Sequence, residues 1–430
     1  MLYRVIIDNY KSFAEETAFD LFPNPKRETF PNHVYGEGAT PVLKSTAIYG
    51  ANGAGKSNLI KGIQFIKEFT TTMSTGKDAQ KMRNWYLNNR FKLPVEDESK
   101  PITMVVEFEN NSQAYIYCIE IDIDGVKSES LLLSGLGKSN HVVFQRDRES
   151  VVFKKAKVVE SIKKTPFGSV LAINGVLHLV EDEHMRNAFL WFLEKLEVIE
   201  ISRDIPWLIE HFKENADMMN FVGEIFTKVG LGIQSLYIKD ESFDQWLKNV
   251  SQEEGKVADI MTNKGLSLSK MIDDVPMLTV TEEDGKRLVR EFVFQQIGRN
   301  GSLCDMDVMS QSTGTLRLLT LIPAIYFAIN KGKTVLIDEI DNGIHPMLIK
   351  NLVKFFGESK SNGQLIYTTH ETALLNQQEL LRPDEVWFVE KVEGCTKMYS
   401  LNGFKIHKTI SIENGYLDGR FGAIPFIGTL

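Results

Sequence analysis

A glycine-rich turn stands between a strand pattern and a helical pattern near residue 50. Residues 47–49 form a short apolar run, and the apolar positions of residues 59–66 recur with helical spacing. The turn between them, residues 50–57, reads GANGAGKS, which is the phosphate-binding P-loop pattern. Because this motif requires a strand before it and a helix after it, the flanking patterns favour it over a glycine-rich turn without a ligand. We therefore expect an α/β chain that binds a nucleoside triphosphate.

The residue types in this turn match the chemistry of a phosphate group. Backbone N–H groups can surround an anion only where the chain makes a tight concave turn, which Gly50, Gly53 and Gly55 permit. Lys56 would reach the β- and γ-phosphates, and Ser57 would supply a hydroxyl to Mg²⁺ at the positive end of the helix. The expected nucleotide-binding residues of the loop are Gly50, Asn52, Gly53, Ala54, Gly55, Lys56, Ser57 and Asn58.

Residues 334–337 form a second signal, a short apolar strand pattern that ends in Asp338 and Glu339. Asp338 would support the Mg²⁺ ion, and Glu339 would orient or deprotonate the attacking water. Taken alone, two acids after an apolar run are typical of a strand that ends at the surface. Combined with the P-loop, they indicate the Walker B strand of a nucleotide-hydrolysing site.

Two further segments carry polar residues at the ends of elements. Ser312 and Gly314 precede an apolar helical pattern at residues 318–329, where they would form either an anion-binding turn or an ordinary helix cap. His370 follows a strand pattern at residues 364–369, where it would contact a γ-phosphate or the attacking water, or serve a structural role. The order of the four signals along the chain favours a nucleotide site for all of them.

In this order the signals resemble the ABC-type ATPases of the branch that includes the structural-maintenance-of-chromosomes proteins, the RecF proteins and the overcoming-lysogenisation-defect ATPases. Residues 9–13, NYKSF, resemble the opening motif of that branch. Within the branch the chain looks most similar to the bacterial abortive-infection ATPases of the AbiLi or RloA type. The runs that carry this likeness are STGTLR at 312–317, DEIDNGIHP at 338–346 and GYLDGRFGAIP at 415–425. The resemblance covers about residues 1–70 and 300–430.

The resemblance implies ATP as the nucleotide, Mg²⁺ as the metal, and hydrolysis of ATP to ADP and phosphate as the activity. It assigns the hydrolytic carboxylate to Glu339, the switch histidine to His370 and a further nucleotide contact to Lys11. Ser312 and Gly314 match the signature that, in such ATPases, caps the nucleotide of a neighbouring subunit. We therefore expect a homodimer or a higher homo-oligomer with ATP at the interface.

Two features depart from the pattern of these ATPases. The signature is not the full Leu-Ser-Gly-Gly-Gln, and His345 stands where many relatives place an aspartate after Walker B. His345 resembles the His-Pro of the lysogenisation-defect branch. It would serve either as an interface contact or as packing at the start of a helix before Pro346.

The composition restricts the class of protein. The chain of 430 residues is 43% apolar and has a net charge of −8, so it can bury a large core but has no overall basic footprint for nucleic acid. No apolar run approaches the length of a membrane span, and residues 1–13 show no cleavage pattern. The three cysteines are widely separated, which argues against a disulfide framework or a zinc site. We expect a cytoplasmic protein without membrane association.

Because the P-loop and the Walker B strand lie far apart in the sequence, the nucleotide-binding fold must be discontinuous. Alternating patterns at 103–108, 115–119 and 142–144 predict an antiparallel sheet, and helical patterns dominate residues 180–275. The expected fold is an α/β P-loop NTPase of the ABC-ATPase type with an antiparallel β subdomain and a compact, mainly helical insertion. Its parts are the N-terminal half of the ATPase domain at 1–150, the insertion at 151–295 and the C-terminal half at 296–430.

Two groups of residues keep nucleic-acid binding open. Trp85 and Tyr86 would either stack bases or pack in the core. A basic cluster near the start of the insertion would be either a binding patch or a solvated strand-and-turn face. Its members are Arg146, Arg148, Lys154, Lys155, Lys157, Lys163 and Lys164.

Nothing in the sequence supplies a nuclease, and no His/Cys cluster or set of paired acids stands beyond the ATP site. A biological effect would therefore be delivered by conformational change or by a separately encoded effector, a nuclease or a toxin. The leading hypothesis is an ATP-dependent oligomer that senses infection and controls such an effector in a bacterial antiphage or abortive-infection system. The alternative is a RecF-like DNA-repair ATPase that binds DNA directly. A transporter motor is disfavoured by the large insertion and the atypical signature.

Overall fold

The computed structural model describes most of the chain, and the chain divides into two compact units. The described residues are 1–36, 40–72, 79–93, 99–148, 150–153, 168–199, 205–249, 271–272, 275–276, 279–283, 285–376, 379–406 and 410–425. The first unit comprises Met1–Glu200, Phe327–Ile340 and Lys350–Leu430, and the second comprises Ile201–Tyr326 and Asp341–Ile349.

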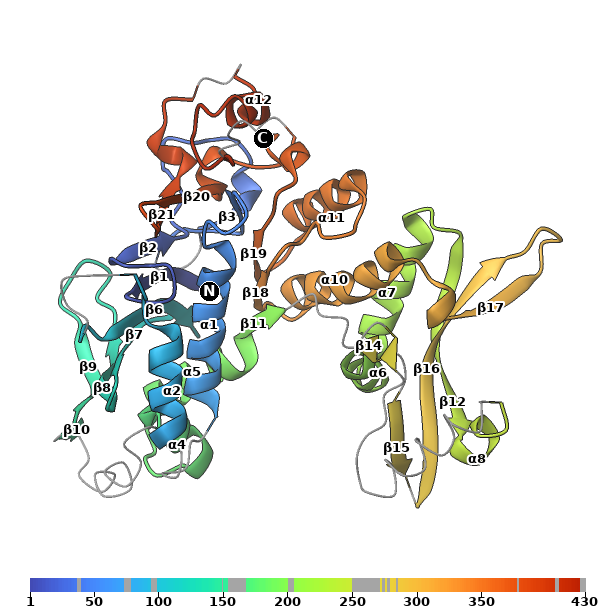
Figure 1. The fold of residues 1–430 in the computed structure, drawn as a ribbon, viewed down its shortest axis with the longest axis horizontal. Helices are drawn as coiled ribbons and strands as arrows, with labels where there is room; N and C mark the ends of the chain where they lie inside the picture. Colours follow the sequence, from blue (N-terminus) through green and yellow to red (C-terminus); the bar gives the residue numbers. More distant parts are fainter. Residues whose placement is uncertain are drawn as a thin grey trace. The chain divides into compact units, whose positions relative to one another are not determined.

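The first unit contains an antiparallel sheet with the strand order β10-β9-β8-β7-β6-β1-β2 (Figure 1). Its strands are β1 (Leu2–Asp8), β2 (Thr17–Asp20), β6 (Ile102–Asn110), β7 (Gln113–Asp122), β8 (Gly125–Leu133), β9 (His141–Asp147) and β10 (Val151–Phe153). Buried and half-buried residues alternate along β6 and β7, as expected of a sheet with one face on the core. The sheet confirms the antiparallel strands predicted around residues 103–144.

A second sheet of the same unit has the order β11-β18-β19-β5-β20-β21. Neighbouring strands are parallel except for the antiparallel pair of β20 and β21. The strands are β5 (Ser45–Gly50), β11 (Leu196–Ile199), β18 (Thr334–Ile337), β19 (Gln364–Thr368), β20 (Val386–Val392) and β21 (Cys395–Ser400). β5, β18 and β19 are buried along their whole length. This burial is expected, because a parallel sheet is covered on both faces and its strands have no polar face.

The edge strand β11 corrects the prediction that this part of the chain is helical. The helical pattern near residue 190 is present in α5 (Glu183–Leu190) and in the π-helical turn Trp191–Lys195. Leu196, which was expected to continue the helix, begins β11 and lies opposite Thr334 of β18. Pairing with a strand about 140 residues downstream decides its conformation, and that pairing leaves no local signal in the sequence.

Helices of the first unit complete its core. α1 (Lys56–Thr71) buries Leu59, Ile60, Ile63 and Ile66, the apolar stripe expected of a helix on a sheet. The same hydrophobic core includes residues of both sheets, of α4 (Val170–Leu177) and of α5. α2 (Ala79–Asn89) lies beside it, with Trp85 stacked on Phe65 of α1 at 3.8 Å between ring centroids.

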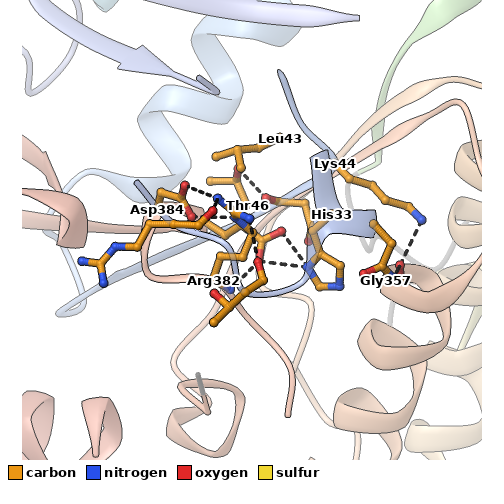
Figure 2. Close-up of polar contacts among 12 residues, drawn as sticks. His33, Leu43, Lys44, Thr46, Gly357, Arg382 and Asp384 are labelled. Carbon is orange, nitrogen blue, oxygen red and sulfur yellow. Dashed lines mark hydrogen bonds and ion pairs between the residues drawn. The ribbon is translucent and has the colours of Figure 1, made fainter. Parts of the chain in front are cut away.

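A buried polar cluster ties the N-terminal segment of the first unit to its C-terminal half (Figure 2). Arg382 and Asp384 form an ion pair at 2.8 Å, with both side chains almost fully buried. The Arg382 guanidinium also donates to the carbonyl oxygen of Thr29 at 2.6 Å. Nearby, Nδ1 of His33 lies 2.9 Å from Oε1 of Glu385. These contacts hold segments about 350 residues apart against each other.

The first unit also contains shorter elements. They are η1 (Pro31–His33), β3 (Val34–Tyr35), β4 (Val42–Leu43), η5 (Thr372–Leu374), η6 (Pro383–Glu385), η7 (Leu401–Gly403) and α12 (Ile412–Leu417). α11 (Pro346–Glu358) begins in the second unit and ends in the first.

The second unit combines helices with an antiparallel sheet ordered β12-β16-β15, in which β17 also pairs with β16. The strands of this sheet are β12 (Ile233–Ser242), β15 (Thr279–Glu283), β16 (Lys286–Ile297) and β17 (Leu303–Asp307). The short strands β13 (Met271–Ile272) and β14 (Val275–Pro276) pair with each other in a separate two-stranded sheet. The helices of the second unit are α6 (Ile205–Glu214), α7 (Ala216–Lys228), α8 (Phe243–Trp246) and η4 (Val308–Ser310).

The insertion therefore differs from the mainly helical one that we expected. The predicted helical pattern near residue 225 is present in α7, whose Phe226 packs on Phe294 of β16. The sheet beneath it was not predicted, because β16 buries residues from both of its faces and so lacks the strict alternation that indicates a strand. The unit starts at Ile201, whereas the insertion was expected from residue 151.

α10 (Thr313–Asn330) passes from the second unit into the first. Contrary to the expectation that no segment could span a bilayer, it is long and apolar enough to do so by length and composition, the single such helix in the described part of the chain. Its 18-residue window is 72% buried inside the protein, so a core helix explains the same composition.

Candidate nucleotide site

The order of the parallel strands gathers the sequence signals of the first unit at one edge of the sheet. β19 lies between β18 and β5, and all three run in the same direction. The carboxyl ends of β18, β19 and β5 lead into Asp338, His370 and the P-loop, respectively. Ligands of open α/β sheets bind at this end of the strands. Three signals that lie far apart in the sequence therefore meet in one place.

The P-loop connects β5 directly to α1. The first turn of α1 starts at Lys56, with Gly55 in the capping position and no side chain capping the turn. Asn52 and Gly53 are exposed, whereas Ala54 and Gly55 are buried. The loop thus presents the start of a 16-residue helix, where the N–H groups and the helix dipole favour an anion.

The Lys56 side chain is buried and points back across its own loop. Its Nζ donates to the carbonyl oxygens of Gly50 at 2.8 Å and Ala51 at 3.3 Å. The same Nζ lies 3.0 Å from Nε2 of His370. The lysine of the P-loop and the histidine at the end of β19 are therefore in direct contact.

Thr368, the last residue of β19, joins the two acids that follow β18. Its hydroxyl donates to Oδ1 of Asp338 at 2.5 Å and accepts from the backbone N–H of Glu339 at 2.7 Å. Glu339 has a left-handed backbone with φ of 53°, a conformation that costs energy in a residue with a side chain. Thr368 thus fixes both acids, although the sequence marked it only as a strand residue.

The residues present fit a magnesium ion held jointly with a nucleotide. Mg²⁺ takes few protein ligands and completes its shell with water and phosphate oxygens. Ser57 in the first turn of α1 and the carboxylate of Asp338 provide two oxygen ligands of the required kind. Within the described residues there is no cluster of three or more His, Cys, Asp or Glu side chains that would hold a metal without a nucleotide.

Lys11, the predicted nucleotide contact of the NYKSF motif, lies in the turn after β1. Its Nζ is 5.6 Å from the centroid of the Tyr10 ring, a cation–π distance. Burial, together with the nearby charges of Lys61 and Lys92, lowers the pKa of the Lys11 ammonium. Its nucleotide contact stays a prediction.

Ser12 and Thr396 contact the P-loop and were not predicted as site residues. The Ser12 hydroxyl accepts from Nδ2 of Asn58 at 2.7 Å, and the Thr396 hydroxyl lies 2.7 Å from the carbonyl oxygen of Ala54. Ser12 carried a signal, because it belongs to the NYKSF motif. Thr396 of β21 carried none, because a threonine in a strand is too common to single out.

The predicted signature residues lie in the second unit, at the start of α10. The exposed Ser312 caps this helix, since its hydroxyl accepts from the backbone N–H of Thr315 at 3.2 Å. A Cβ atom on Gly314 would lie 3.0 Å from the carbonyl oxygen of Gly343, so a small residue suits this approach. The capping role is thus present, and a second role toward a neighbouring subunit stays a prediction.

His345 lies at the start of α11 in the same unit. Its Nδ1 accepts from the backbone N–H of Met347 at 3.2 Å, and its side chain is exposed. The contact supports the helix-start role.

The candidate nucleic-acid residues that the structure describes are engaged in packing and polar contacts. Arg146 is buried and donates to the carbonyl oxygen of Gly168 at 2.7 Å, and Arg148 forms an ion pair with Asp122. Tyr86 is 2% exposed. The five lysines of the cluster lie outside the described residues: Lys154, Lys155, Lys157, Lys163 and Lys164.

Comparisons with known proteins identify the family and the fold of this chain. A profile of the family described as "AAA domain, putative AbiEii toxin, Type IV TA system" matches residues 45–376. The solved structure titled "Crystal structure of the SmcHead bound to the C-winged helix domain of ScpA" is 15% identical, with a TM-score of 0.50 and coverage of 96% of this chain and 99% of that chain. An SMC head domain from Thermotoga maritima is 13% identical, with a TM-score of 0.39 and coverage of 94% and 99%. No curated protein matches the chain. The likeness to the first head shows the P-loop NTPase fold, as predicted.

Proposed function

The chain belongs to the family described as "AAA domain, putative AbiEii toxin, Type IV TA system", and we propose that it is the ATP-hydrolysing subunit of a bacterial antiphage or abortive-infection system. The observation that carries the proposal is the convergence of the P-loop, the Asp338-Glu339 pair and His370 at the carboxyl ends of β5, β18 and β19. The finer likeness to the AbiLi or RloA type is part of the same proposal, as is a cytoplasmic location.

Each polar group at this edge has a task in the proposed reaction. The first turn of α1 and Lys56 hold the phosphates, and Ser57 and Asp338 hold Mg²⁺, which would neutralise charge on the phosphates. Glu339 accepts a proton from the attacking water, and His370 contacts the terminal phosphate. The 3.0 Å contact between Lys56 and His370 supports this arrangement, because both side chains must reach the same phosphate.

The active form is proposed to be a dimer or a larger oligomer with ATP at its interface. Exposure of Ser312 at the start of α10 supports it, since an exposed helix start is available to a phosphate held by another copy. The oligomer would control a separately encoded effector. The solved head of similar fold is bound to a domain of another protein, ScpA, and is an example of this fold carrying a partner.

The proposal is tested by ATP turnover and oligomeric state in wild type and three variants. Lys56→Ala should lose ATP binding. Glu339→Gln should bind ATP but turn it over about 100-fold more slowly and accumulate as the ATP-bound oligomer in light scattering. Ser312→Arg should remain smaller and inactive, whereas Ser302→Arg, a matched change at another exposed serine of the second unit, should behave as wild type.

The outcomes separate the alternatives. If Glu339→Gln turns ATP over at the wild-type rate, Glu339 is not the hydrolytic carboxylate. If Ser312→Arg assembles and remains active, the proposal that the nucleotide site is shared between subunits is wrong. Purification with the native neighbouring gene products, with and without ATP, tests the defence role. A stoichiometric partner that joins or leaves with ATP supports an effector system, whereas salt-dependent DNA binding by the chain alone supports the repair-type alternative.

A further inference from the structure

The peptide group between Ala54 and Gly55 is held from behind by side chains from both ends of the chain. The Thr396 hydroxyl of β21 lies 2.7 Å from the Ala54 carbonyl oxygen and 2.7 Å from the Ser12 hydroxyl oxygen. The Ser12 oxygen in turn lies 2.7 Å from Nδ2 of Asn58 in α1. Four polar groups thus form one continuous series of hydrogen bonds. The series runs from the Asn58 amide of α1 through the two hydroxyls to the Ala54 carbonyl oxygen.

The direction of each hydrogen bond follows from the chemistry of the groups. A carbonyl oxygen can only accept, and a hydroxyl has one hydrogen to donate. Thr396 therefore donates to Ala54, Ser12 donates to Thr396, and the Asn58 amide donates to Ser12. Both hydroxyl hydrogens in this chain of hydrogen bonds have a partner, an arrangement in which such a network is stabilising.

This chain sets the direction in which the next N–H group points. The described chain has no cis peptide bond, and in a trans peptide the C=O and the following N–H point in opposite directions. With the Ala54 carbonyl directed at Thr396, the Gly55 N–H is directed away from β21. We propose that Thr396 and Ser12 are positioning residues that aim the Gly55 N–H at the phosphates of the nucleotide, an inference that rests on the proposed function.

The glycine at position 55 fits this arrangement. Its φ is 120°, and a Cβ atom there would lie 2.2 Å from Oγ1 of Thr396 and 2.9 Å from Oγ of Ser12. The two hydroxyls occupy the space that a side chain would need. Gly55 is thus required by the hydroxyl pair behind the loop as well as by the backbone conformation.

The two hydroxyls are themselves held in place by the backbone. The N–H of Thr396 donates to the carbonyl oxygen of Ser12 at 2.7 Å, so the strand β21 and the turn after β1 are bonded side by side. Thr396 is 2% exposed. A buried pair of bonded segments is a rigid support for the loop.

The test compares Thr396→Val, which removes the hydroxyl but keeps the shape, with Thr396→Ser, which restores it. Binding of a fluorescent N-methylanthraniloyl ATP with Mg²⁺ should weaken about fivefold to tenfold in Thr396→Val, the effect of one hydrogen bond, and stay within about twofold of wild type in Thr396→Ser. In steady-state turnover KM should rise while kcat stays within about twofold, because the phosphate contact exists before and during the reaction.

A matched control separates positioning from a general loss of stability. Thr334→Val removes a hydroxyl that is also 2% exposed and bonded, at 2.9 Å to Gln364, but at the opposite end of β18 from Asp338. It should lower thermal stability about as much as Thr396→Val and leave ATP binding unchanged. Ser12→Ala is a second route to the same loss, and its effect should be less than additive with Thr396→Val.

The outcomes distinguish the inference from the proposed function. If the wild type binds ATP and Thr396→Val and Ser12→Ala bind it equally well, the positioning role is wrong and the proposed function stands. If the wild type itself does not bind ATP, and Lys56→Ala behaves identically, the proposed function fails and the inference with it. If Thr396→Val loses ATP binding and Thr396→Ser retains it, the result supports both the positioning role and the proposed function.

Discussion

Nζ of Lys56 and Nε2 of His370 lie 3.0 Å apart, although the two residues are separated by more than 300 positions in the sequence. An ammonium group can only donate, so Nε2 accepts and the imidazole carries its hydrogen on Nδ1. The parallel pairing of β19 with β5 creates this contact. The phosphate-binding lysine and the histidine are therefore mechanically linked, and a change at one affects the position of the other.

The first prediction concerns His370. His370→Ala should lower kcat about 100-fold, the usual effect of losing a group that acts in the transition state, while ATP still binds through Lys56 and the loop. Single-turnover ATP hydrolysis measures the chemical step without product release. His141→Ala, at an exposed histidine that starts β9, is the matched control and should hydrolyse ATP at the wild-type rate. An unchanged single-turnover rate in His370→Ala would leave the histidine a structural role only.

The second prediction concerns Thr368. Thr368→Val removes the hydroxyl that joins the Asp338 carboxylate to the Glu339 N–H, so both acids lose their support. We expect kcat to fall about tenfold, and the Mg²⁺ concentration for half-maximal rate to rise by a similar factor, because outer hydrogen bonds typically change metal affinity or activity by this amount or more. Titration of Mg²⁺ at saturating ATP measures both. Thr368→Ser should retain most of the activity; equal losses in the valine and serine variants would contradict the role of the hydroxyl.

The catalytic signals were predictable because each is local. Each signal follows a strand that has its own apolar pattern: the P-loop, the acids after residues 334–337 and the histidine after residues 364–369. Because the strands are parallel, their carboxyl ends meet at one edge of the sheet, so no further sequence signal is needed to predict the site. β11 and Thr396 were not predicted, because they depend on partners far away in the sequence. Ser12 belongs to the NYKSF motif, but its contact with Asn58 was not predicted. The short segment 196–199 becomes a strand because it pairs with β18. Its sequence alone gives no sign of that distant partner, so the strand could not be predicted.

The third prediction concerns the buried cluster around Arg382 (Figure 2). Arg382→Met should lower the free energy of unfolding by about 3–5 kcal/mol, because it leaves the buried carboxylate of Asp384 without its ion-pair partner. Adding Asp384→Asn should restore part of the loss. Arg4→Met is the control, because the Arg4 side chain is 34% exposed and 3.5 Å from Glu107; it should cost less than about 1 kcal/mol. Urea unfolding measures all three, and equal costs at Arg382 and Arg4 would contradict the prediction.

The last prediction follows from Lys44, which precedes β5. Its Nζ donates to the carbonyl oxygens of Gly357 at 3.1 Å and Ser359 at 2.5 Å, at the end of α11 (Figure 2). Burial lowers the pKa of Lys44 from 10.5 to about 8, and the carboxylate of Glu385 opposes this shift. The ammonium is therefore more costly in the folded protein than in the unfolded chain, and the cost is fully present at neutral pH.

The sign of the pH dependence follows directly. Below pH 8 both states carry the charge. Between about pH 8 and 10.5 the folded protein loses its proton first, so the contribution of Lys44 to stability improves as the pH rises, by at most about 1.4 kcal/mol per pH unit. Because other groups titrate in the same range, the informative quantity is the stability difference between wild type and Lys44→Met. From pH 7 to pH 9.5 this difference should move in favour of the wild type in urea unfolding. Lys354→Met, at an exposed lysine of α11, is measured beside it as a reference. A stability difference between wild type and Lys44→Met that stays constant from pH 7 to pH 9.5 would show that the Lys44 ammonium carries no burial cost.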